Sequence, residues 1–163
     1  MRFDAEHRFA AAPGEVAAAW CDPAFHLGTA LPDVAVVELV AHDRDGTGTT
    51  LALRYAYVGG LDPVARRVLG GAEPTWVQTL VLDRSTLRGR LTITPDRAAD
   101  RLRAGAAVTL RAEGGGTLRH LAGDLEVRVP LVGGAAARGL VAGVLRRLDA
   151  EAAALAARLG EGA

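Results

Sequence analysis

Several residue types are missing or rare in this chain of 163 residues. It contains no lysine and no asparagine, a single serine (Ser85) and a single cysteine (Cys21). Without lysine, neither a Schiff-base lysine nor a phosphate-binding lysine is possible, and Ser85 lies in a turn-like sequence instead of a nucleophile elbow. A single cysteine excludes an internal disulfide framework and is typical of a reducing compartment. These absences argue against serine hydrolysis and against lysine-based chemistry.

The chain also lacks an excess of charge of one sign. Nineteen arginines balance nineteen aspartates and glutamates, so no field would gather nucleic acid or an anionic membrane. Residues 1–8 interleave charged with apolar side chains, unlike the apolar core of a signal peptide, and no later stretch approaches an uncharged membrane span. We therefore expect a cytoplasmic protein that binds no nucleic acid and does not insert stably into membranes.

The histidines are too scattered to indicate a metal site. His7, His26, His42 and His120 lie far apart, and no pair has the i, i+4 spacing of a helical metal site. A structural zinc site would also need more than one cysteine in most of its known forms. We expect neither a metal nor a cofactor.

Hydrophobic periodicity predicts mostly β-structure. Residues 2–9 alternate between apolar and charged side chains, as in a half-buried strand. Pro13 suits the first turn of a short helix ending near Asp22-Pro23, and a second short helix is expected over 24–31. Hairpin-type turn sequences then separate the strands of an antiparallel meander. These predicted strands cover residues 34–42, 47–58, 75–84, 87–94, 104–113 and 117–129.

A short helix is predicted between two of these strands, over residues 63–69. Asp62 supplies its N-cap and Pro63 its first helical position. Arg66 and Arg67 on this helix have two interpretations: a solvated face, or contacts to a carboxylate or phosphate headgroup at a cavity mouth. The sequence leaves their role open.

The final segment predicts a long helix after Gly133-Gly134, with residues 160–163 frayed. At about 100° per residue, its large apolar side chains fall in one sector under half a turn wide. A wide surface must cover this sector, and the concave face of the preceding sheet fits that need. The sector contains Ala137, Leu140, Val141, Val144, Leu145, Leu148, Ala152, Leu155 and Leu159, with Glu151 and Arg158 at its edge.

Three features carry a resemblance to a known superfamily: the stretch FDAEHRFAAAPGEVAAAWCDPAF, Trp76 in a strand, and the stretch GDLEVRVPLVGGAAARGLVAGVL. With the order of elements, they resemble the START-like superfamily, also called Bet v 1-like, SRPBCC or helix-grip, and within it the actinobacterial DUF2505 group. The resemblance implies one α+β domain over residues 1–163. Its expected architecture is a seven-stranded curved antiparallel sheet, with two short helices after strand 1 and a long C-terminal helix across the concave face.

In that superfamily the space between sheet and helix is often a cavity for a lipid, sterol or polyketide, although a fold alone does not decide function. Three functions stay open: non-catalytic binding of a small apolar or amphipathic ligand, a polyketide cyclase or aromatase, and a structural or homodimeric role with a filled core. The enzyme would use His7 or a tyrosine for proton transfer.

We expect ligand binding, by a monomer or homodimer, and assign no catalytic residue. Core packing is the alternative interpretation for His7 and for each aromatic residue. Strand parity, the clustering of the few aromatic residues on strands, and the helical sector predict these pocket residues: Phe3, His7, Phe9, Tyr55, Tyr57, Trp76, Leu140, Val144 and Leu148.

Overall fold

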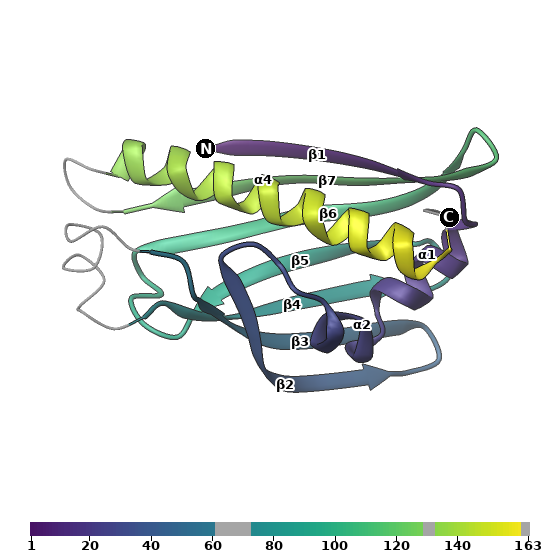
Figure 1. Cartoon of the computed structure of the whole chain (residues 1–163), viewed down its shortest axis with the longest axis horizontal. Coiled ribbons are helices and arrows are strands. Elements are labelled where there is room, and N and C mark those ends of the chain that lie inside the picture. The colour runs from purple at the N-terminus through teal and green to yellow at the C-terminus, as the bar shows by residue number, and fades with distance from the viewer. Residues whose placement is uncertain (61–72, 129–132, 161–163) are drawn as a thin grey trace.

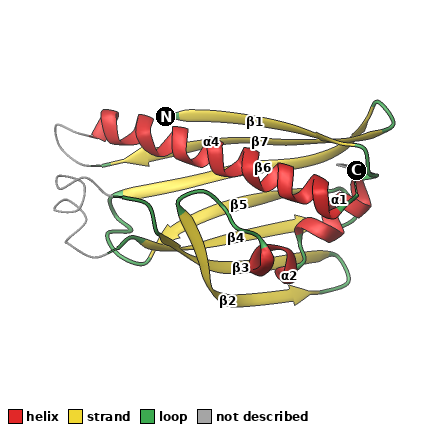
Figure 2. Ribbon diagram, in the orientation of Figure 1, coloured by secondary structure: helices red, strands yellow, loops and turns green. Residues whose placement is uncertain are grey.

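The computed structural model of the protein describes residues 1–60, 73–128 and 133–160. A seven-stranded antiparallel sheet carries the long helix α4 across one face (Figures 1 and 2). The strand order is β1-β7-β6-β5-β4-β3-β2, so β1 and β2 are the edges. The predicted α+β class is confirmed. The elements are β1 (Arg2–Phe9), α1 (Pro13–Trp20), α2 (Pro23–Gly28), β2 (Val34–Arg44), β3 (Gly48–Tyr57), β4 (Thr75–Asp83), β5 (Arg88–Pro95), β6 (Leu102–Glu113), β7 (Gly116–Val127) and α4 (Gly133–Arg158).

Most predicted bounds agree with the observed ones. The first strand covers residues 2–9 as predicted, and the other strands begin and end within two residues of their predicted bounds. The second helix ends at Gly28, earlier than predicted, because Thr29 has extended backbone angles. Residues just before Pro32 are disfavoured in a helix, and Leu31 instead forms an isolated bridge to Val34. The helix predicted over 63–69 lies outside the described residues, as do residues 161–163 of the segment 160–163 that was predicted to be frayed.

Local side-chain contacts explain where the two short helices begin. Pro13 occupies the first turn of α1, and the Glu15 carboxylate accepts a hydrogen bond from the Ala12 amide at 3.0 Å. At α2, the Asp22 carboxylate accepts from the Ala24 amide at 2.9 Å. Both helices are therefore defined by residues next to them in sequence.

The hydrophobic core consists of two groups of buried side chains. The larger group joins α1, α2 and α4 to five neighbouring strands of the sheet, β1, β7, β6, β5 and β4. The smaller group, which we call the β3 cluster, consists of Leu51, Leu53 and Tyr55, with Trp76 of β4 partly buried against it. Helix α4 packs mainly on β7, β1 and α1. The β3 end of the concave face therefore has an apolar surface of its own.

All members of the predicted sector of α4 except Leu140 are buried or half-buried. Leu148 and Leu155 are 1% and 0% exposed, whereas Leu140 is 43% exposed. The helix starts beside β1 and β7 and runs obliquely towards α1 (Figure 1), so its buried side changes along its length. Towards the middle, that side includes Arg147 and Glu151. The prediction that Leu140 faces the sheet and lines a pocket is therefore wrong.

In the described part of the chain, no helix combines the length and the apolar character that crossing a bilayer requires.

Candidate functional site

A buried ion pair joins the sheet to α4. Arg119 of β7 donates an Nη1–H bond to Glu151 Oε1 at 2.9 Å, and the two side chains are 0% and 1% exposed. Arg119 points inward because side chains alternate along a strand, and its neighbour His120 lies on the outer face. Burial removes both charges from water, so the pair requires close geometry and further hydrogen bonds to persist.

Neighbouring groups supply those further contacts. Trp20 Nε1–H donates to the same Glu151 oxygen at 2.8 Å, and Arg119 Nη2–H donates to the Leu148 carbonyl at 3.3 Å. The Arg119 guanidinium also lies 4.7 Å from the ring centroid of Trp20 and 5.6 Å from that of Phe9. The ion pair thus connects α1, β1, β7 and α4.

Glu151 is ionised at this site despite its burial. Burial raises the pKa of the Glu151 carboxyl, but the charges of Arg119 and Arg147 outweigh that effect and lower it below its usual value. The carboxylate therefore carries its full negative charge at neutral pH.

A second buried arginine, Arg147, lies on α4 near this pair. Its side chain reaches across to β4, where its Nη2–H donates to Gln78 Oε1 at 2.5 Å, and the residue is 4% exposed. Its guanidinium carbon lies 5.3 Å from the ring centroid of Tyr55. Neither contact supplies a negative charge, and Glu151 is already paired with Arg119.

Tyr55 and Trp76 complete the surroundings of Arg147. They are cross-strand partners on β3 and β4, and their rings stack with centroids 5.8 Å apart. Arg147, Gln78, Tyr55 and Trp76, which we call the Arg147 cluster, therefore occupy one part of the concave face. This part lies where the β3 cluster meets the larger core.

Several buried polar atoms here have no hydrogen-bond partner among the described residues. Each such atom has lost its contacts with water, which costs about 1–3 kcal/mol when no partner replaces them. Three of them belong to the Arg147 cluster and three to its neighbourhood. They are Arg147 Nη1, the Tyr55 hydroxyl, Trp76 Nε1, Glu151 Oε2, Arg119 Nε and His26 Nδ1.

The Tyr55 hydroxyl is protonated in this setting. Burial raises the pKa of Tyr55 to about 12, while the nearby Arg147 charge opposes the shift. The hydroxyl therefore keeps its proton at neutral pH and is available to an acceptor.

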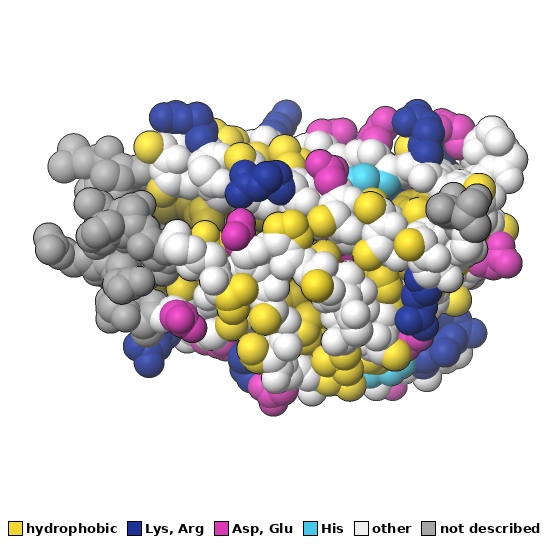
Figure 3. Space-filling model, viewed as in Figure 1, with side chains coloured by type: hydrophobic (Ala, Val, Ile, Leu, Met, Phe, Trp, Pro, Cys, Tyr) yellow, Lys and Arg dark blue, Asp and Glu magenta, His cyan; other side chains and the backbone are white. Residues whose placement is uncertain are grey.

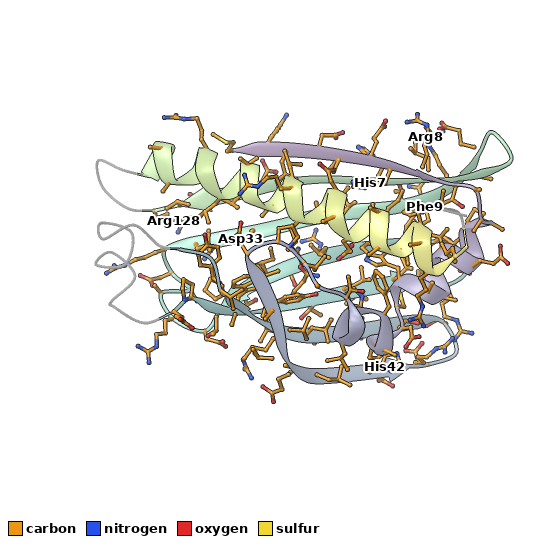
Figure 4. The ribbon with its side chains drawn as sticks, in the orientation of Figure 1. His7, Arg8, Phe9, Asp33, His42 and Arg128 are labelled. Carbon is orange, nitrogen blue, oxygen red and sulfur yellow. The ribbon has the colours of Figure 1, made fainter. Side chains whose placement is uncertain are left out.

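His7 lies at the edge of the site, with both ring nitrogens engaged. Its Nδ1 accepts from Arg119 Nη2–H at 3.2 Å, and its Nε2–H donates to Asp149 at 3.0 Å. This tautomer follows because a guanidinium can only donate. Burial and the Arg119 charge lower the pKa of His7. Figure 4 shows His7 and Phe9 on β1 beside α4, with Arg8 on the outside.

The structure divides the other predicted pocket residues between core and site. Phe3, Phe9 and Leu148 belong to the larger core, and Val144 is half-buried against it. A Cβ atom at Gly123 would lie 2.7 Å from Phe3 Cζ, so the Phe3 ring takes up the space of the missing side chain. Tyr57 is half-buried. Of the predicted set, Tyr55 and Trp76 are the residues that the Arg147 cluster contains.

The other histidines serve separate local contacts. Buried His26 donates from Nε2 to the Trp20 carbonyl at 2.7 Å, and His120 bonds Asp4 at 2.8 Å on the outer face. His42 is exposed on β2, at the edge of the sheet opposite β1 (Figure 4). Within residues 1–60, 73–128 and 133–160, no three His, Cys, Asp or Glu side chains are grouped to hold a metal ion.

Four residues of the site were not predicted to belong to it: Gln78, Arg119, Arg147 and Glu151. Strand parity could have placed two of them on the inner face. Arg119 alternates with the outward-facing His120, and Gln78 shares a face with Trp76 and Leu80. Glu151 was predicted only at the edge of the apolar sector. For Arg147 the helical period contains a signal. At about 100° per residue it lies about 20° from Leu140, just outside the apolar sector, whereas its neighbour Arg146 lies on the opposite side of the helix.

Comparison with protein families gives one assignment. The model of a family described as "Protein of unknown function (DUF2505)" matches residues 4–159. No curated protein matches the chain in sequence.

Comparison with solved structures gives the fold. A protein from Thermus thermophilus, TTHA0849, has a TM-score of 0.71 at 22% identity, with 100% of both chains covered. The Zhui aromatase/cyclase from Streptomyces sp. R1128 has a TM-score of 0.63 at 15% identity, covering 98% of this chain and 93% of that one. A START superfamily protein from Mycobacterium smegmatis has a TM-score of 0.55 at 16% identity, covering 98% and 97%. These likenesses confirm the predicted helix-grip fold.

Proposed function

The chain belongs to the DUF2505 family, and from this membership and its helix-grip fold we propose that it binds a small amphipathic molecule, lipid-like or polyketide-like, without catalysing a reaction. The ligand lies between the concave face of the sheet and α4. The observation that carries the proposal is the group of buried polar atoms without partners at the Arg147 cluster. A polar group of a ligand would satisfy these atoms and remove their desolvation cost.

The β3 cluster supports the apolar half of the proposal. Leu51 and Leu53 are 2% and 1% exposed, and Leu31, Val34 and Val36 pack against them while staying partly accessible. Figure 3 shows hydrophobic side chains gathered on the same side of the molecule as α4, over the region of α2 and β2. An apolar ligand body beside the Arg147 cluster would thus contact the partly accessible side chains of Leu31, Val34 and Val36.

The protonation states in the site favour binding over proton transfer. Tyr55, with a pKa of about 12, holds its proton too firmly to act as a base at neutral pH. His7 uses both ring nitrogens in contacts with Arg119 and Asp149. The hypothesis of a cyclase that relies on His7 therefore has no support in the contacts of that side chain.

The two tryptophans allow a local test, because Trp76 belongs to the site and Trp20 is 1% exposed in the core. In the variant Trp20→Phe, only Trp76 emits, and titration with dodecanol or a flat aromatic phenol should shift its emission to saturation at micromolar concentration. In Trp76→Phe, the same titration should leave the remaining emission nearly unchanged. The proposal is refuted if calorimetry detects no binding and neither variant responds.

A further inference from the structure

The buried charges of the described residues do not balance. Arg119 and Arg147 each bring a positive charge, and Glu151 brings a negative one, with all three residues at most 4% exposed. Asp149, the partner of His7, does not correct this imbalance because its side chain is 72% exposed and solvated. Among the described residues, one buried positive charge is therefore left uncompensated, which is strongly unfavourable in a protein interior.

The contacts assign this excess charge to Arg147. Arg119 is 2.9 Å from Glu151, whereas the side-chain hydrogen bond of Arg147 goes to the neutral amide of Gln78. Its Nη1 group has no acceptor in the described part of the chain. An acceptor with a negative charge would satisfy the hydrogen bond and the charge at once.

Two neutral polar groups belong to the stacked ring pair next to this cation. The hydroxyl of Tyr55 and Nε1 of Trp76 are both buried without partners, and their rings stack against each other. The Arg147 guanidinium lies 5.3 Å from the Tyr55 ring centroid. Arg147 Nη1 and Trp76 Nε1 can only donate, and the Tyr55 hydroxyl can donate as well as accept, so the described residues of the cluster include no anionic acceptor.

We infer that the ligand is a monocarboxylate with an apolar body, such as a long-chain fatty acid or an aromatic acid. The inference rests on the proposed function and specifies its ligand class. The carboxylate pairs with Arg147 Nη1 and accepts from the Tyr55 hydroxyl, while the apolar body lies on the β3 cluster. A single negative charge balances the single excess charge, whereas a phosphate dianion would reverse the imbalance and an ammonium group would increase it.

Three ligands of equal chain length test the inference on the full chain: dodecanoic acid, dodecanol and dodecylamine, titrated at neutral pH by calorimetry below micelle-forming concentrations. The acid should bind at least about tenfold more tightly than the alcohol, and the amine more weakly than the alcohol. Lowering the pH until the acid is protonated should remove its advantage.

Two neighbouring arginines provide a variant and its matched control. Arg147→Gln should bring the affinity for the acid down to that for the alcohol, because the charge is lost while a polar side chain remains. Arg146→Gln should keep the full preference, because that side chain is 63% exposed. Tyr55→Phe, which removes one donor without altering charge, should weaken acid binding several-fold.

The outcomes separate the two proposals. If acid and alcohol bind wild-type protein equally, the carboxylate inference is wrong and the proposed function stands. If the acid preference survives in both Arg147→Gln and Tyr55→Phe, the assignment to these residues is wrong. If none of the three ligands binds, both proposals fail. The wild-type comparison decides the ligand class even if a variant does not fold.

Discussion

Arg119 on β7 and Glu151 on α4 form an ion pair with an N–O distance of 2.9 Å and almost no exposure to solvent. The pair connects the last strand of the sheet to the last helix, and Trp20 of α1 bonds the same carboxylate. Burying two charges is costly, so the pair does not by itself make the fold more stable. Its importance shows when one of its members is removed.

Removal of the carboxylate should be more harmful than removal of the arginine. Glu151→Gln should lower the free energy of unfolding by about 3–5 kcal/mol, because Arg119 and Arg147 then remain buried without a counter-charge. Arg119→Gln should cost less, since Arg147 remains as an opposite charge near Glu151. Urea denaturation of both variants measures the difference. The opposite order would contradict the charge balance described above.

The two tryptophans should differ in what their indole N–H groups contribute. Trp20→Phe removes a hydrogen bond to the buried Glu151 carboxylate, whereas Trp76→Phe removes a donor without a described partner. The free energy of unfolding should therefore fall by at least about 1.5 kcal/mol more in Trp20→Phe. Thermal or urea unfolding of the ligand-free variants tests this. Equal losses would mean that the Trp20 bond contributes nothing.

His7 should make the stability of the protein depend on pH. Burial and the Arg119 charge lower its pKa in the folded state, so the unfolded chain binds a proton more readily. The contribution of neutral His7 to the free energy of unfolding is therefore complete above about pH 6.5, the usual pKa of histidine. It is lost as the pH falls below that value.

Unfolding free energies measured across this pH range, and an NMR titration of the His7 ring, give the test. His7→Gln should flatten this part of the curve, while His42→Gln, at an exposed position on β2, should keep the wild-type shape. A His7 titration midpoint above that of a free histidine would reverse the predicted sign.

Two leucines on α4 should respond differently to truncation. Leu148→Ala should cost about 2–5 kcal/mol, because the side chain is 1% exposed in the larger core. Leu140→Ala should change the free energy of unfolding by no more than about 0.5 kcal/mol, because Leu140 is 43% exposed. Urea denaturation separates the two cases. A large loss at Leu140 would mean that this side chain is covered in solution.

Part of the candidate site could be predicted from the sequence. Parity along β3 grouped Tyr55 with apolar residues, and Trp76 was predicted as one of the aromatic residues clustered on strands; both are in the Arg147 cluster. Parity along β7 likewise places Arg119 on the inner face, but a pattern based on hydrophobicity alone assigns an arginine to the surface. For Leu140 the angular sector was misleading, because a helix that crosses a sheet obliquely does not bury the same side along its whole length.

The sequence by itself determined the elements and their order, because alternation along strands, the helical period and turn residues all act over a few neighbouring positions. The fold followed from the family resemblance that this order and its motifs carry. Only the tertiary structure decided that Arg119, Arg147 and Glu151 are buried. A charged side chain enters a core when distant segments supply its partners, and β7 and α4 meet only after folding. The excess charge at Arg147, which supports the inferred ligand class, is therefore a property of the folded chain alone.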